Sequence, residues 1–424
     1  MNNIDIVSQK KDYLYQLLKL SVFISLFFSL TAISKGGDLK NFVPFFTFIL
    51  AVAYIIYNKK VSILRTPVFY SMIAYVAVSY LLLPFSVSPP VSFESLNKEL
   101  LSGFFIFAGV YVIARNEEEN PSGHGGYNFI INSLVFMLLI LSVSGFVALI
   151  VADESIASRD ILNIKSIKFR IHHNEFAIIA NLMLPFVIFN LISANTLFKK
   201  SIFLGIAAFS VIVIFMNISR GGWVALIVIF FMWIFFIIRR YKKIRLALFA
   251  SALIIISVAG LWIISHPFRE RVKSTVEHAK TITGRTHIWS IYIEGIKQSP
   301  ITGWGYGNKI AWYKSPIVLD GKEKKEIVWK EIGGFHAHNM ILDVFFDQGI
   351  TGLILFLILM GLNLFYIIRT FRIEDEYYRL LSFAMFTGFI GVFIIHGFIE
   401  SIPFKLIAIM SGLVGGLTRL NYEY

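Results

Sequence analysis

The sequence predicts an all-α polytopic membrane protein. Hydrophobic residues make up 57% of the 424 residues and charged residues only 15%, which leaves too little polar surface for a soluble protein of this size. The mean hydropathy is +0.72. Apolar runs follow one another along nearly the whole chain, and they approach the roughly 20 residues that a helix needs to cross a bilayer. We therefore expect residues 1–424 to form a single integral membrane domain.

About twelve membrane-spanning helices are expected from these apolar runs. They fall at approximately 13–33, 41–58, 66–86, 98–114, 128–152, 174–193, 201–217, 222–238, 245–265, 339–368, 380–398 and 403–419. The first run follows Lys10 and Lys11 but reaches no small-residue cleavage site, which favours a retained span over a removed signal peptide.

Basic residues in the short connections predict the orientation in the membrane. Lys59-Lys60, Lys199-Lys200, residues 239–243 and the arginines between residues 369 and 379 fall on every second connection. Cytoplasmic loops carry the excess of lysine and arginine, so these connections are expected on the cytoplasmic side. Both termini then lie inside, and the polar segment 266–338 forms one large periplasmic loop.

Composition also limits the partners and the chemistry. The net charge of +13 suits lipid headgroups or an anionic lipid-linked substrate better than nucleic acid, because no basic face interleaved with stacking aromatic residues is present. The absence of cysteine excludes disulfides and thiolate chemistry. No histidine and carboxylate cluster has the spacing of metal ligands, and the acidic residues of the long loop are scattered. We therefore expect metal-independent chemistry and no cofactor.

The long loop is predicted to contain one short helix near residues 285–297. Ile288, Trp289, Tyr292 and Ile296 recur at helical spacing on one face, which is typical of an amphipathic helix lying at the membrane surface. A glycine-rich turn, residues 303–308, follows Pro300. Residues 315–330 are charged and lack an apolar period, so this part of the loop is expected to be mobile.

Arg220 is the first candidate for the active site. It stands at the outer start of an apolar run, where the helix dipole is already positive, so an arginine is favourable there only if an anion binds nearby. Its guanidinium and the amides of Gly221 and Gly222 predict a phosphate site. The alternative is an arginine that extends to lipid headgroups. Arg285 repeats the pattern at the first turn of the loop helix, with a solvated surface arginine as its alternative.

His338 is the candidate general base. It lies just before the apolar run that begins at Met340, where the helix dipole and nearby arginines favour the neutral imidazole. A neutral imidazole at a membrane surface is suited to accept a proton. The alternative is an interfacial histidine with a packing role. His336, Asn339, His173 and Arg170 are candidate substrate-binding residues, although paired histidines at an interface, as at His172-His173, often serve only as amphipathic anchors.

These motifs together resemble the O-antigen ligase family and its wider superfamily, which includes O-antigen polymerases. The resemblance is strongest over residues 200–370 and is carried by Ser219-Arg220-Gly221-Gly222-Trp223, Gly284-Arg285-Thr286 to Trp289, Pro300 to Asn308, and His336-Ala337-His338-Asn339 leading to Gln348-Gly349-Ile350-Thr351-Gly352. It implies a fold similar to the C-type membrane glycosyltransferases. Residue by residue, it implies roles for Arg220, Arg285 and His338. The family's histidine often follows a Gly-Pro turn, whereas here His336 stands two residues earlier.

The activity implied by the resemblance is metal-independent, inverting glycosyl transfer in lipopolysaccharide biosynthesis. The donor would be a polysaccharide on undecaprenyl diphosphate, and the acceptor a sugar hydroxyl of the lipid A core, at the periplasmic face of the bacterial inner membrane. Two alternatives remain. An O-antigen polymerase would use the same donor with a second lipid-linked glycan as acceptor. A lipid-linked glycan transporter or flippase would show related halves and a site near the middle of the membrane.

Overall fold

The computed structural model describes most of the chain as helix. The described residues are 3–30, 39–116, 124–151, 173–217, 219–242, 259–260, 262–263, 269–270, 273, 283–307, 310, 337–398 and 404–421. Within these ranges the chain forms helices and connecting turns, with no strand. Nine helices of this described part are long and apolar enough to cross a membrane. The all-α polytopic fold class predicted from the sequence is confirmed.

The principal helices follow the predicted spans closely. They are α1 (Asn3–Leu30), α2 (Leu39–Tyr57), α3 (Pro67–Leu81), α5 (Ser102–Arg115), α6 (Gly125–Val151), α7 (His173–Ser193), α8 (Leu197–Met216), α9 (Arg220–Tyr241), α14 (Met340–Thr370), α15 (Glu376–Phe398) and α16 (Phe404–Leu417). The apolar part of α2, Phe42–Tyr57, and the 14-residue α16 are shorter than a usual span. The expected span 245–265 lies mostly outside the described residues.

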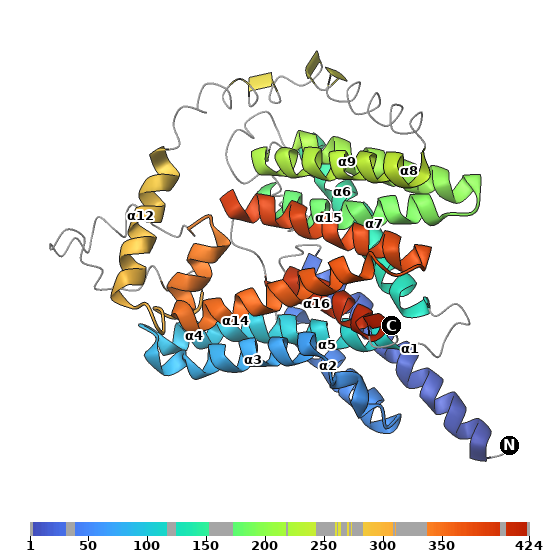
Figure 1. The fold of residues 1–424 in the computed structure, drawn as a ribbon, viewed down its shortest axis with the longest axis horizontal. Helices are drawn as coiled ribbons and strands as arrows, with labels where there is room; N and C mark the ends of the chain where they lie inside the picture. The colour runs from blue at the N-terminus through green and yellow to red at the C-terminus, as the bar shows by residue number, and fades with distance from the viewer. Residues whose placement is uncertain are drawn as a thin grey trace.

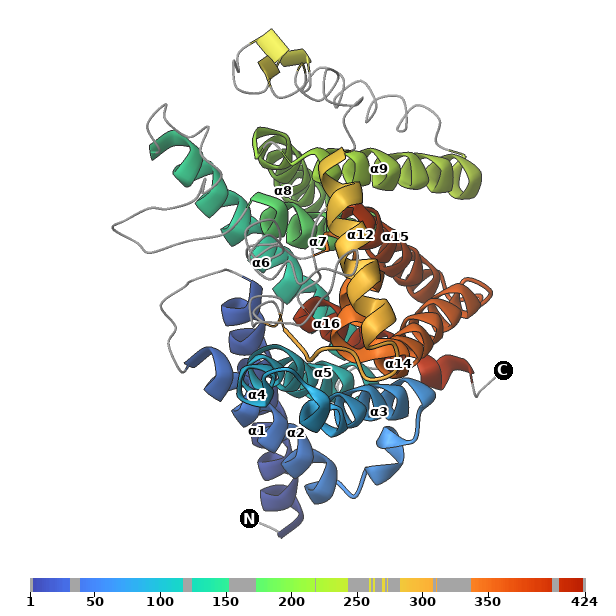
Figure 2. The same cartoon turned by 90° about the vertical axis from the view of Figure 1, so that its left-hand side faces the viewer.

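The long helices run roughly side by side, and α12 (Thr283–Gln298) crosses one end of the bundle (Figure 1). Figure 2 looks onto that end, with α12 in front of the helix ends. We call it the α12 end. The basic connections meet at the opposite end: Arg240 donates to Glu376 at 2.6 Å, and Lys60 donates to Asn116 at 3.1 Å.

Close contacts between helices depend on small residues, as is usual in a membrane, where the hydrophobic effect does not drive helices together. α5 and α16 are packed closely along their lengths. A Cβ on Gly412 would lie 2.8 Å from the side chain of Val110 and 3.2 Å from the carbonyl oxygen of Phe107, so this close approach requires glycine. The buried Asn363 of α14 donates to Ser411 of α16 at 2.8 Å, which adds a polar link inside the apolar core.

Two local features differ from the sequence prediction. Residues 87–97 were expected as a connection between the predicted spans 66–86 and 98–114, but Pro89–Ser95 forms the helix α4, which continues through a π-helix (η3, Leu96–Leu101) into α5. Prolines at the first helical positions lack an N–H that would be unsatisfied there in any case, so they favour this start. In addition, the predicted span at 339–368 is interrupted, because Gly349 inside α14 has non-helical torsions (φ 63°, ψ −166°).

Candidate functional site

Two asparagines of α7 hold the turn that carries Arg220 through hydrogen bonds. Ser219 is the N-cap of α9, and its fully buried hydroxyl accepts from the amide of Gly222 at 3.3 Å. The same hydroxyl donates to Asn174 at 2.9 Å. Asn181 donates to the carbonyl of Gly222 at 3.2 Å. Arg220 is therefore the first residue of a firmly anchored helix, as the sequence predicts, and it is half-buried.

One part of the predicted phosphate site needs correction. The sequence suggests that the amides of both Gly221 and Gly222 are available to an anion, but the structure shows the Gly222 amide engaged by the Ser219 side chain. This side-chain cap satisfies a donor that an isolated helix start would expose. The Gly222 amide is thus removed from the predicted phosphate site, and the guanidinium of Arg220 remains a predicted anion-binding group of this turn.

Gly222 is expected to tolerate no larger residue, because a Cβ there would lie 2.6 Å from the Cβ of Ala177 in α7. We expect Gly222→Ala to lower stability by about 1–3 kcal/mol through overpacking and to displace Arg220. The measurement is thermal unfolding of the detergent-purified protein, together with its membrane abundance. Gly205→Ala in α8 is the matched control, since a Cβ there meets nothing within 4 Å. Equal stability of the two variants would contradict the close packing of α7 and α9.

His338 lies in a tight turn immediately before α14. Asn339 is the N-cap of this helix, and its side chain accepts from the amides of Ile341 and Leu342 at 3.0 and 3.2 Å. His338 itself is half-buried and has a positive φ of 51°, which is uncommon for a residue other than glycine. Asn339, proposed from the sequence as a substrate-binding residue, has its side-chain oxygen occupied by this cap.

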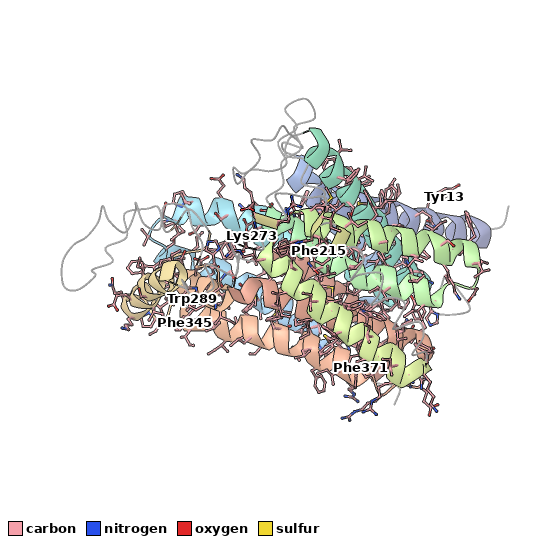
Figure 3. All side chains as sticks on the ribbon, turned by 90° about the horizontal axis from the view of Figure 1, so that it is seen from above. Tyr13, Phe215, Lys273, Trp289, Phe345 and Phe371 are labelled. Atoms are coloured by element: carbon pink, nitrogen blue, oxygen red, sulfur yellow. The ribbon has the colours of Figure 1, made fainter. Side chains whose placement is uncertain are left out.

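The helix α12 packs against this turn through its apolar face. Ile291, Tyr292 and Ile296 form a small buried cluster with Ala337 and Phe346. Burial raises the pKa of the Tyr292 hydroxyl well above its usual value, and the nearby carboxylates of α14 add to the effect. Tyr292 and Ile296 belong to the apolar face that the sequence analysis named, whereas Ile291 does not. Figure 3 labels Trp289 and Phe345 at this end, away from Phe371 and Tyr13.

The glycine-rich segment forms hydrogen bonds where α14 is broken. The amide of Ile350 donates to the carbonyl of Pro300 at 2.8 Å, and the amides of Trp304 and Gly305 donate to Phe346 and Asp347, each at 2.9 Å. These bonds satisfy backbone groups that the break at Gly349 removes from the helical pattern. A Cβ on Gly349 would collide with the carbonyl of Ile301, so the close approach requires glycine there. The segment is thereby joined to the interrupted helix.

A half-buried acidic group that contacts this segment was missed by the sequence analysis. The carboxylate of Asp347 accepts from the amide of Gly307 at 3.0 Å. Burial raises the pKa of the Tyr306 hydroxyl well above its usual value, and Glu99, Tyr75 and Asp347 contribute. A very small cavity of about 10 Å³, lined by Tyr306, Asp347 and Gln348 among others, lies here. A signal was available, because acidic residues within an apolar span are costly and mark sites with a specific role.

The structure brings some of the predicted site residues to a common region. The helix that carries Arg285 contacts Ala337, the residue next to His338, at the α12 end. Arg285 lies in the first turn of α12, but its side chain is outside the described residues, as is that of His173, the first residue of α7. His336, His172 and Arg170 lie outside the described residues. Arg220 belongs to the same end through α9, whose start is anchored to the start of α7.

The fold and this site define the class as a polytopic helical membrane protein. It has a half-buried arginine at the start of α9 and a histidine turn before α14 that packs against α12, both at one end of the bundle. Residues 205–357 match the sequence model of a family described as O-antigen ligase. This match includes Arg220, Arg285 and His338. Two curated relatives are similar to parts of this chain, and together these matches support a resemblance to the O-antigen ligase family.

The relatives match only parts of their own lengths. The O-antigen ligase of Salmonella typhimurium (strain LT2) is 28% identical over 233 residues, which cover 51% of this chain and 52% of the relative. The exopolysaccharide production protein ExoQ of Rhizobium meliloti (strain 1021) is 29% identical over 137 residues, which cover 31% of this chain and 30% of the relative. The chain thus matches about half of the first relative and less than a third of the second.

Proposed function

We propose that this protein is a glycosyltransferase that moves a polysaccharide from undecaprenyl diphosphate to a sugar hydroxyl of the lipid A core. The observation that carries the proposal is the shared location of an arginine-bearing helix start and a histidine turn within the segment that matches the O-antigen ligase family. A diphosphate leaving group needs cations, and a hydroxyl nucleophile needs a base. The proposed setting is the bacterial inner membrane, with the α12 end at the periplasmic face.

Arg220 and Arg285 would neutralise the charge that develops on the diphosphate as it leaves. Arg220 suits this role because its helix start is held by Ser219 and Asn174, so the backbone that carries the guanidinium needs little ordering on binding. Arginine also matches the forked geometry of phosphate oxygens better than lysine does. The surface position of α12 would bring Arg285 to the level of the headgroups, where the diphosphate of a polyprenyl lipid resides.

His338 would accept the proton of the acceptor hydroxyl as its oxygen attacks the anomeric carbon. A bond forms between that oxygen and the anomeric carbon, the bond between the anomeric carbon and the diphosphate oxygen breaks, and its electron pair leaves with undecaprenyl diphosphate. Attack from the face opposite the leaving group inverts the configuration at the anomeric carbon. No further energy source is needed, because the glycosyl diphosphate is already activated.

Polymerisation of lipid-linked repeat units is the second candidate. One relative is named as an exopolysaccharide production protein and not as a ligase, which supports polymerisation as the second candidate function. A flippase is less consistent with the site, because the described candidate groups lie at one end of the bundle and not at its middle.

A deletion strain separates the three functions. A ligase predicts that the lipid A core lacks all polymer while lipid-linked polymer accumulates. A polymerase predicts a core that bears a single repeat unit, and a flippase predicts carrier trapped on the cytoplasmic side. Purified protein in proteoliposomes with lipid-linked polymer and rough lipopolysaccharide should give the ligated product. Unchanged substrates in the presence of folded protein would contradict the ligase proposal.

We expect chelation of divalent ions to leave the reconstituted reaction within about twofold of its original rate, because arginine side chains supply the positive charge that metal ions supply in other diphosphate sites. The rate should be measured with EDTA and again after adding magnesium or manganese. Loss of transfer that either metal restores would show that a metal ion takes part.

A further inference from the structure

We infer that Trp289 is a positioning residue for His338, and that α12 thereby couples the diphosphate arginine to the base. The inference rests on the proposed function in assigning the base to His338. Its structural part, that Trp289 holds the His338 backbone in its positive-φ conformation, stands on the geometry alone.

Both backbone groups of Ala337 are held by side chains. Its amide donates to Asp343 at 2.8 Å, and its carbonyl accepts from the indole N–H of Trp289 at 2.8 Å. Ala337 is fully buried, so water does not compete for these bonds. The carbonyl of Ala337 and the amide nitrogen of His338 belong to one planar peptide unit. The Trp289 hydrogen bond therefore holds the Ala337–His338 peptide plane in one orientation, and φ of His338 is the rotation of His338 relative to that plane.

The opposite side of His338 is fixed by α14. The Asn339 side chain caps the helix through the amides of Ile341 and Leu342, so the backbone after His338 cannot rotate without disrupting the helix start. Between these two anchors, His338 adopts φ 51°. This conformation is uncommon for a residue with a side chain, although histidine adopts it more readily than most, and contacts on both sides of the residue favour it here. The hydrogen bond from Trp289 is the polar contact by which α12 holds the peptide unit before His338.

The same helix carries Arg285, one turn before Trp289. Arg285 and Trp289 belong to one continuous helix, whose face packs on Ala337 and Phe346 through Ile291, Tyr292 and Ile296. A displacement of α12 at Arg285 would therefore move the indole that holds the Ala337 carbonyl. Binding of a diphosphate by Arg285 would favour one position of α12, and that position would set the direction of the His338 imidazole.

A purely structural role for Trp289, fastening α12 to the bundle, is the competing explanation, and Trp304 provides the matched control. The Trp304 indole N–H donates to the carbonyl of Gly295 at 2.8 Å, and its ring packs on the same cluster. It fastens the same helix with the same chemistry but does not contact the His338 turn through that bond. Removal of either N–H by substitution with phenylalanine keeps an aromatic ring in place.

We expect Trp289→Phe to lower kcat for glycan transfer about 10-fold or more while the donor KM changes less than twofold, because a misplaced base slows chemistry without weakening donor binding. Trp304→Phe should leave kcat within about twofold. Asp343→Asn keeps an oxygen that can accept from Ala337 and should retain more activity than Asp343→Ala, which provides a second test if Trp289→Phe folds poorly. Equal kcat in Trp289→Phe and Trp304→Phe would overturn the inference.

The structural part of the inference, that Trp289 holds the His338 backbone at positive φ, can be tested without measuring catalysis. Hydrogen exchange of the amides of residues 337–339 should be faster in Trp289→Phe than in Trp304→Phe, and an experimental structure of Trp289→Phe should show His338 with a relaxed φ. An unchanged positive φ would overturn the inference even if activity fell. Absence of transfer by the wild-type protein would instead contradict the proposed function, while exchange and φ would still decide whether Trp289 holds the turn.

Discussion

Replacement of His338 should abolish glycan transfer, with a loss of at least about 100-fold, because a positioned general base contributes 10²–10⁴-fold to rate. His338→Ala removes the imidazole but also places alanine at φ 51°, which disfavours the turn. His338→Asn is the sharper variant, since asparagine adopts positive φ more readily than other residues with a side chain. Both variants should be inactive in proteoliposomes at equal protein abundance, with donor binding retained.

The control for the base assignment is His336→Ala, which should reduce transfer much less. His336 is two residues away, whereas His338 directly precedes the N-cap of α14. The reverse pattern of losses would assign the base to His336. Activity retained by His338→Asn but lost by His338→Ala would show that the residue acts through its backbone conformation and not through its imidazole.

Arg220→Lys should lower transfer about 10-fold or more, because lysine keeps the charge but loses the fork that binds two phosphate oxygens, and a charge-assisted hydrogen bond contributes about 1.5–3 kcal/mol. If Arg220 only extends to headgroups, lysine serves equally well and activity survives. Arg285→Lys should behave alike. Because both residues are proposed to hold one leaving group, the double variant should lose less than the product of the single losses.

The matched control for these variants is Arg239→Lys. Arg239 lies in the last turn of the same helix α9, at the opposite end of the bundle, and its guanidinium lies 5.4 Å from the ring centre of Phe235. Like Arg220, Arg239 is an arginine at one end of α9, but it has no proposed part in the reaction. Transfer rates at equal membrane abundance decide the matter: near-wild-type transfer by Arg220→Lys would remove the arginine clamp from the mechanism.

The sequence by itself determined the class of protein and the positions of nearly all the described helices. Hydropathy reports the free energy of moving each segment from water into lipid, and that quantity depends on about 20 neighbouring residues and not on the fold. Helix starts at Arg220 and after Asn339 were likewise visible, because caps are local. The amphipathic period of residues 285–297 is local as well, and the helix α12 occupies that segment.

Contacts between distant residues were decided only by the tertiary structure. Trp289 and Ala337 are 48 positions apart, and Ser219 and Asn174 are 45 apart; nothing in either local sequence specifies the partner. The break of α14 at Gly349 also depends on a distant segment, since residues 300–305 supply and satisfy the hydrogen bonds there. A hydropathy pattern shows that a helix enters the bilayer, but it does not show which polar groups meet when helices pack. At the α12 end, this packing sets the conformation of His338.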